Sequence, residues 1–81
     1  MKRLGTVLHT IDNLLIVRAD QTLEKDVLYQ NSIVVTKKMI RIGKIKELFG
    51  PVNCPYFSIK LFRNVPNSEI NNLKNERVYL Q

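Results

Sequence analysis

Short segments that alternate apolar and polar residues make up most of the chain, and this is the pattern of half-buried β-strands. The clearest segment is Tyr56–Phe62, in which Phe57, Ile59 and Leu61 share one face. Turn-forming residues separate the segments, and helical periodicity is poor. Many short strands with frequent turns predict an all-β fold, either a small barrel or a sandwich. Closure into a barrel would also remove exposed edge strands.

The other expected strands are, in chain order, Leu4–Ile11, Leu14–Ala19, a short segment at most within Leu23–Tyr29, a segment starting at Ile33, Met39–Leu48 and Arg77–Leu80. Leu14–Ala19 is apolar at both parities up to Arg18, which indicates a strand covered on both faces or placed at a barrel seam. Residues 36–38 form either a small turn or an exposed break. One helical turn is expected over Glu69–Leu73, with Ser68 as its N-cap.

The alternation is interrupted within Ile42–Phe57, which holds two of the three glycines, two of the three prolines and the only cysteine. Ile40 and Ile42 share one parity, Ile45 falls on the other, and Gly43 lies between them. A β-bulge or sharp strand bend is therefore predicted at the glycine, because glycine adopts positive φ at little cost.

A stiff loop is predicted over residues 49–56. Gly50-Pro51 ends the preceding strand, and Pro55 restricts the chain again. The apolar side chains of this loop are Phe49, Val52 and Tyr56. Two interpretations stay open: the phenylalanine and valine close the end of the core, or the loop is a docking surface whose low entropy and few anchors give affinity.

Length and charge limit the classes of protein. With 81 residues, the whole range 1–81 is expected to be one domain. No apolar run approaches the ~20 residues of a membrane span, and no signal-peptide core follows the basic N-terminus. A single cysteine excludes an internal disulfide and suggests nothing about secretion. The expected compartment is the cytosol or its equivalent. Thirteen Lys and Arg against seven Asp and Glu give a net charge of +6, which suits association with RNA.

Catalytic patterns are missing from the sequence. His9 is the only histidine, has no Cys or carboxylate at ligand spacing, and is expected to have a structural or surface role. Cys54 is expected to be a small, semi-buried filler rather than a nucleophile. The carboxylates form no recognisable acid–base pair, and there is no Gly-rich phosphate loop or zinc pattern. We therefore expect a non-enzymatic protein with no cofactor, no metal and no small-molecule substrate.

Five basic residues fall close together in the sequence: Lys37, Lys38, Arg41, Lys44 and Lys46. They form either a stripe that follows a phosphate backbone or the solvated face of a strand. The second interpretation is favoured, because RNA-reading sheets place several aromatic residues beside the positive charge. Here only Tyr56 lies near Lys60 by parity.

Six segments carry a resemblance to a known family: Leu4–His9, Leu15–Arg18, Ile42–Ile45, Glu47–Val52, Pro55–Tyr56 and Ser58–Lys60. The most specific is the string Phe-Gly-Pro-Val-x-x-Pro-Tyr, since two prolines and a glycine at fixed spacing rarely arise by chance. Together they closely resemble the core domain of the Gar-type subunit of box H/ACA ribonucleoproteins, the particles of RNA-guided pseudouridylation. The likeness covers nearly the whole chain and weakens after about Phe62.

This resemblance implies a six-stranded antiparallel barrel of the translation-factor type. It implies docking on the catalytic domain of a dyskerin-type pseudouridine synthase, with a role in substrate RNA loading and release through a mobile loop of the synthase. Guide RNA and the rRNA substrate would be mainly indirect partners. Eukaryotic members carry glycine–arginine-rich extensions that this sequence lacks, so it looks like an archaeal member or an isolated core. The expected location is cytoplasmic if archaeal and nucleolar if eukaryotic.

The residues expected to bind the synthase are Gly43, Phe49, Gly50, Pro51, Val52, Pro55 and Tyr56. The three apolar side chains would be anchors, the loop glycine and both prolines would hold the loop, and Gly43 would shape the approach. Two other functions stay open. One is a small basic barrel that binds RNA directly, such as a ribosome-associated protein. The other is the related H/ACA assembly factor, which shares this core but usually carries long extra segments.

Overall fold

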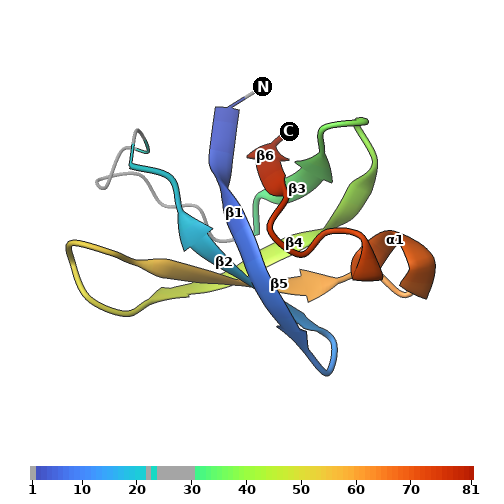
Figure 1. The fold of residues 1–81 in the computed structure, drawn as a ribbon, viewed down its shortest axis with the longest axis horizontal. Coiled ribbons are helices and arrows are strands. Elements are labelled where there is room, and N and C mark those ends of the chain that lie inside the picture. Colours follow the sequence, from blue (N-terminus) through green and yellow to red (C-terminus); the bar gives the residue numbers. More distant parts are fainter. Residues whose placement is uncertain (1, 22, 24–30) are drawn as a thin grey trace.

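The computed structural model describes residues 2–21, 23 and 31–81. The strands are β1 (Lys2–Ile11), β2 (Leu14–Ala19), β3 (Ile33–Thr36), β4 (Arg41–Phe49), β5 (Tyr56–Leu61) and β6 (Arg77–Leu80), and the helix is α1 (Asn67–Asn71). The strands pair antiparallel in the order β1-β2-β5-β4-β3-β6, and β6 pairs back to β1, so the described residues form a closed barrel (Figure 1). The predicted six-stranded barrel is confirmed.

The core fills the inside of the barrel and comes from the predicted alternation. On β5, Phe57, Ile59 and Leu61 are all buried, as their shared parity predicts. On β2, Leu15 and Val17 are buried while the two apolar residues of the other parity are half-buried, which fits a strand in a barrel wall. The expected segment Leu23–Tyr29 lies outside the described residues except for its first residue, which is buried.

The turn between β3 and β4 explains why β4 begins later than the sequence predicts. Met39 N donates to the Thr36 carbonyl over 2.9 Å, and Thr36 N donates to the Ile40 carbonyl over 3.0 Å. The Thr36 hydroxyl also accepts from two backbone N–H groups of the turn, at 3.2 and 3.3 Å. Met39 has φ 69°, so it belongs to the turn and not to the strand. The alternative of a small turn at residues 36–38 is confirmed.

Met39 occupies a backbone position that usually takes glycine or asparagine, the left-handed residue after a type I turn. The other described non-glycine residues with positive φ are all Asp or Asn. Since the left-handed conformation costs an ordinary L-residue about 1 kcal/mol, Met39→Asn should raise the free energy of unfolding by roughly that amount. Urea unfolding followed by circular dichroism measures the change. Lys38→Asn, one residue earlier at a position without positive φ, should leave it unchanged.

The helix near the C-terminus exists, but its predicted cap is wrong. Pro66 is the N-cap residue, and no side chain caps the helix. The Pro66 carbonyl accepts from Glu69 N at 3.0 Å and from Ile70 N at 3.3 Å. Ser68 therefore lies inside the first turn, because Pro66 is the extended residue immediately before the helix and the helix starts two residues earlier than predicted. Among the described residues, no helix is long and apolar enough to cross a membrane.

Close packing, and not backbone freedom, is the reason for Gly43. The predicted irregularity is present, since the pairing of β3 with β4 shifts in register opposite residues 41–43. The prediction of positive φ at Gly43 is wrong, because among the described glycines it is Gly50 that has positive φ. A Cβ on Gly43 would clash with the Lys60 carbonyl oxygen and lie 3.0 Å from Ile59 Cγ2. Gly5 has the same relation to the Arg18 carbonyl oxygen. Both glycines let neighbouring strands approach where the small barrel bends.

Candidate functional site

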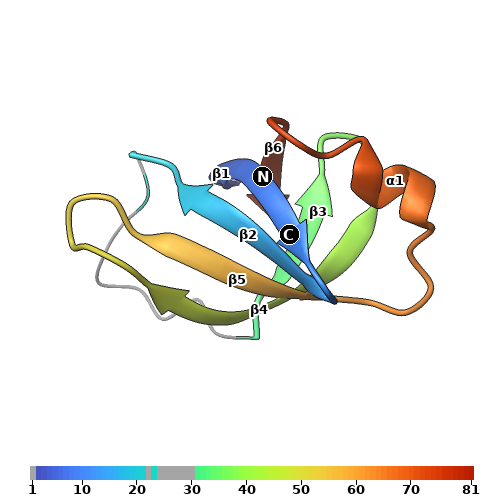
Figure 2. The same cartoon turned by 60° about the horizontal axis from the view of Figure 1, so that its bottom comes forward.

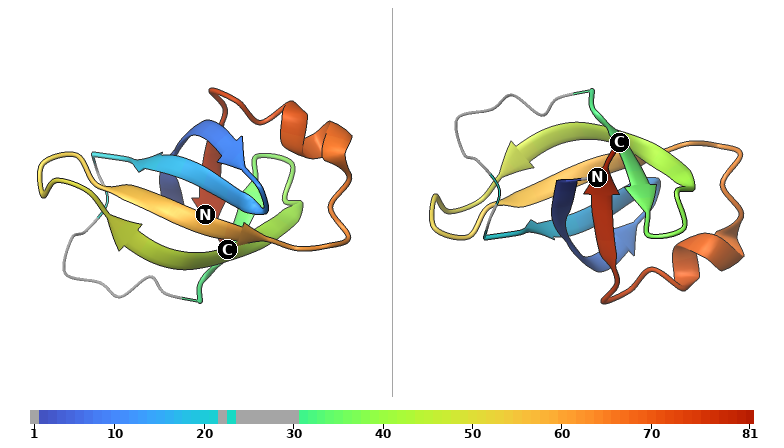
Figure 3. Two further views of the ribbon diagram at one scale, coloured as in Figure 1. Left: turned by 90° about the horizontal axis from the view of Figure 1, so that it is seen from below. Right: turned by 90° about the horizontal axis from the view of Figure 1, so that it is seen from above.

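The loop between β4 and β5 lies at one end of the molecule, with α1 at the other end (Figures 2 and 3). β4 ends at Phe49 and β5 begins at its register partner, Tyr56, as the Gly-Pro stop predicts. Cys54 N donates to the Pro51 carbonyl over 3.1 Å, which closes a turn within the loop. Gly50 has φ 96°, a conformation that L-residues other than glycine rarely adopt. The loop thus combines two prolines, one internal hydrogen bond and one left-handed glycine.

The apolar side chains of this loop face solvent. Val52 is 77% exposed and Phe49 is 42% exposed. Tyr56 is half-buried, and its ring centroid lies 5.8 Å from that of Phe49. A Cβ on Gly50 would lie 2.7 Å from a Tyr56 ring carbon, so the glycine leaves room for this ring. The interpretation in which the phenylalanine and valine close the end of the core is therefore wrong.

A groove of about 750 Å³ runs along the base of the loop. One wall is the hairpin itself, residues 48–55, and the other is formed by residues 18–21 and Leu23. Leu48 lies in register with the buried Phe57 but is 51% exposed. The hairpin therefore offers apolar side chains both at its tip and towards the groove.

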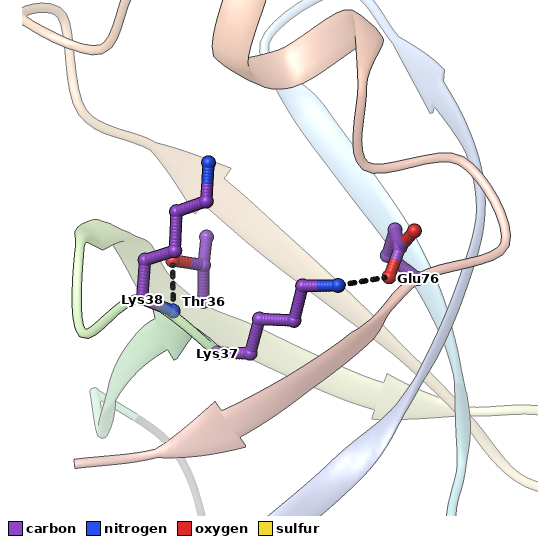
Figure 4. A network of polar contacts seen from close by, with 4 residues as sticks. All are labelled: Thr36, Lys37, Lys38 and Glu76. Carbon is purple, nitrogen blue, oxygen red and sulfur yellow. Dashed lines mark hydrogen bonds and ion pairs between the residues drawn. The ribbon is translucent and has the colours of Figure 1, made fainter.

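The structure divides the five basic residues that are neighbours in the sequence. Lys37 and Lys38 lie in the β3–β4 turn, and Lys37 Nζ is 3.5 Å from Glu76 Oε2 (Figure 4). Arg41, Lys44 and Lys46 lie on β4 and are exposed. The run therefore does not form one continuous stripe.

Two side chains with possible chemistry lie on the surface. Cys54 is exposed, so its expected role as a semi-buried filler is wrong. It sits in the loop between β4 and β5, which projects from the barrel (Figure 2). His9 is exposed on β1. In the part of the chain that the structure describes, no group of three or more His, Cys, Asp or Glu side chains is placed to hold a metal ion.

Comparison with known proteins decides the family. The family model described as the Gar1/Naf1 RNA binding region matches residues 1–81. The chain belongs to the Gar1/Naf1 family. The resemblance predicted from the sequence motifs is thereby confirmed, and the family is one of non-catalytic components related to H/ACA ribonucleoprotein biogenesis.

Several proteins resemble this Gar1/Naf1 domain. An uncharacterized protein of Methanothermobacter thermautotrophicus is 33% identical over 81 residues, which cover 99% of this chain and 83% of that protein. The H/ACA ribonucleoprotein complex non-core subunit NAF1 of Saccharomyces cerevisiae is 34% identical over 58 residues, or 72% of this chain but only 12% of the yeast protein. The solved structure of the Gar1 domain of Naf1 superposes with a TM-score of 0.80 at 28% identity, covering 98% of this chain and 80% of that one.

Sequence reasoning missed three surface residues of this Gar1/Naf1 domain. The sequence pattern assigns Leu48 to a strand, as the structure confirms, but gives no sign that its side chain is 51% exposed. Lys60 lies directly opposite Lys44, and Arg18 lies directly opposite Tyr56. No local pattern could have found these two pairs, because they depend on which strands become neighbours and in which register.

Proposed function

We propose that this chain is the non-catalytic Gar-type subunit of an H/ACA ribonucleoprotein and docks on the catalytic domain of a dyskerin-type pseudouridine synthase. The observation that carries the proposal is the gathering of Leu48, Phe49 and Val52, all large and exposed, at the end of one hairpin. Exposed apolar groups that cluster on a small protein mark an interaction site. Family membership and the H/ACA subunit among the relatives favour a protein of that particle as partner.

The loop has the physical properties of a preorganised anchor. Ordering flexible side chains and loops lowers the affinity of a complex, and a loop with a fixed shape avoids much of this cost. The left-handed Gly50, the two prolines and the contact between the rings of Phe49 and Tyr56 all restrict the loop before any partner arrives. The adjacent groove can receive an apolar side chain of the partner against Leu48.

The proposed role in pseudouridylation acts through the synthase. The docked subunit assists loading and release of the substrate RNA by favouring one position of a mobile synthase loop, as the family resemblance implies. Guide RNA and rRNA substrate are then mainly indirect partners of the docking loop. This fits a loop that exposes apolar side chains and contains no Lys or Arg.

Two calorimetric titrations at about 0.15 M salt, near physiological ionic strength, test the proposal. One titrates the chain into a dyskerin-type synthase, and the other titrates it into an H/ACA guide RNA without the synthase. The proposal predicts tight binding to the synthase and weak, salt-sensitive binding to the RNA. Tight RNA binding together with no synthase binding would contradict it and favour the direct RNA binder.

The assembly factor is a second candidate, because the yeast relative and the solved structure are both Naf1 proteins. Both candidates would use the same docking surface, so binding to the synthase does not separate them. Their place in the particle does. The Gar-type subunit stays in the purified, active ribonucleoprotein, whereas an assembly factor is replaced before the particle matures. Mass spectrometry of the active particle from the source organism distinguishes the two.

A further inference from the structure

Two lysines lie directly opposite each other on the outside of the barrel. Lys44 of β4 and Lys60 of β5 are register partners, and both are exposed. Directly opposite residues have Cβ atoms about 5 Å apart, and like charges at that separation destabilise a sheet. Among the described residues, the ion pairs are Arg3–Asp20 and Lys37–Glu76, so neither lysine of this pair forms an ion pair with a described acid. Glu47, opposite Ser58, is the acid in the next row of the same face.

The neighbours of the lysine pair in the same row are apolar. Ile33 on β3 is the other partner of Lys44, and Leu14 on β2 is the other partner of Lys60. Both are half-buried. Lysine stems pack along such apolar side chains and hold their ammonium groups above them. The row therefore presents two adjacent positive charges that an anion would stabilise.

Another row on the same face lies closer to the docking loop, on the far side of the row formed by Ile16, Ser58 and Glu47. Tyr56 has Arg18 of β2 on one side and Phe49 of β4 on the other. Tyr56 and Lys60 are on the same strand about 13 Å apart, at about 3.3 Å per residue. Aromatic rings and guanidinium planes stack on the bases of unpaired RNA, while lysines contact its phosphates. The register thus brings together the aromatic and cationic groups that the sequence placed apart.

We propose that the outer face of β2, β5 and β4 binds single-stranded RNA, with the phosphate backbone on the Lys44–Lys60 pair and a base beside Arg18 and Tyr56. The net charge of +6 and the cationic row supply the attraction to phosphate. The three strands are paired on both sides, so this face has no free edge for an added peptide strand. Tyr56 is also a proposed anchor of the docking loop, so the base position would border a docked synthase.

Salt-dependent RNA binding by matched charge variants tests this site. The probe is a 5′-fluorescein-labelled, 12-nucleotide oligouridylate, read by fluorescence anisotropy between 0.05 and 0.2 M salt. The variant is Lys44→Thr/Lys60→Thr, because threonine suits strands. The control is Lys38→Thr/Lys74→Thr, two exposed lysines in turns away from this face. Both double variants lower the formal net charge from +6 to +4, since each removes two lysines.

Losing two phosphate contacts should lower the slope of log affinity against log salt by about 1.4, at about 0.7 per contact. Across this salt range the wild-type affinity should therefore fall about sevenfold more than that of the variant, from the same relation. The control should keep the wild-type slope. Equal losses in both double variants would mean that only net charge matters and would overturn the site, as would an unchanged slope in Lys44→Thr/Lys60→Thr.

Three further measurements keep the result interpretable. The unfolding midpoint of Lys44→Thr/Lys60→Thr should not fall, because the substitution removes a like-charge repulsion; the single variants, each with a slope change of about 0.7, serve if the double variant fails to fold. A 12-base-pair RNA duplex should bind more weakly than the single strand. Equal binding would contradict the proposed contact between a base and the Arg18–Tyr56 row.

Replacing the lysine pair should not change the affinity for the synthase. A loss of synthase affinity would indicate that this face binds protein and not RNA. The RNA titration uses the chain alone, so its outcome is independent of the docking proposal.

Discussion

Gly43→Ala should lower the free energy of unfolding by about 3 kcal/mol, because the new methyl group has no space in the barrel wall. Its Cβ would clash with the Lys60 carbonyl oxygen, which belongs to the neighbouring strand β5. That oxygen cannot move without displacing the pairing of β4 with β5. Small domains have total stabilities near the lower end of 5–15 kcal/mol, so this loss is a large share of the whole. Urea unfolding followed by circular dichroism should show a lower midpoint at an unchanged m value.

Ser58→Ala is the matched control for this substitution. Ser58 is buried in β5, its partner across β4 is Glu47, and its hydroxyl oxygen has no hydrogen-bond partner. Removing an unpaired buried hydroxyl relieves its desolvation cost, so the unfolding midpoint should stay the same or rise. If Gly43→Ala left the unfolding midpoint unchanged while this control behaved as expected, the result would contradict the conclusion that β4 and β5 approach too closely at Gly43 to admit a side chain.

Phe49→Ala/Val52→Ala should weaken binding to a dyskerin-type synthase by about 3 kcal/mol, which is more than a hundredfold in Kd. Both side chains are exposed in the free chain, so the substitution removes contacts with the partner and little from the core. The unfolding midpoint should therefore change little. Isothermal titration calorimetry with the purified synthase measures the effect. Tyr56→Ala should cost roughly 1–3 kcal/mol of binding, since its ring also supports Phe49.

Ile11→Ala provides the control for the loop variants. Ile11 is 51% exposed, similar to Phe49, and lies on β1 beside the β1–β2 turn. Its truncation should leave synthase affinity unchanged. Equal losses in this control and in the loop variant would indicate a nonspecific apolar contact and would remove the loop from the docking site.

Local sequence signals predicted the parts of the fold that depend on neighbours along the chain. The strands expected at Leu14–Ala19 and Arg77–Leu80 have the same bounds in the structure. Gly50-Pro51 marked the end of β4, because proline cannot donate in a ladder and the glycine adopts positive φ. The family motif then supplied the closed barrel, which alternation alone did not separate from a sandwich.

Features that depend on strand neighbours were beyond the sequence. The backbone of β5 lies so close to Gly43 that no side chain fits there. The sequence therefore predicted the position of the strand irregularity correctly but attributed the glycine to positive φ. Lys37 and Lys44 looked like members of one basic run, yet the β3–β4 turn places Lys37 beside Glu76. Lys60, sixteen positions after Lys44 (60 − 44), is its direct partner in the β4–β5 hairpin, whose register shifts between Ile45 and Glu47. Pairing register, a non-local property, decides which charges meet.

Alkylation of Cys54 tests the docking loop most directly. It is the only cysteine of the chain, it is exposed, and it lies within the loop. N-ethylmaleimide labelling of this chain, followed by intact-mass spectrometry, can be timed with and without saturating dyskerin-type synthase. We expect labelling to slow in proportion to the fraction of chain bound. Unchanged labelling in a complex that calorimetry shows to be fully formed would contradict it and would place the interface elsewhere on the barrel.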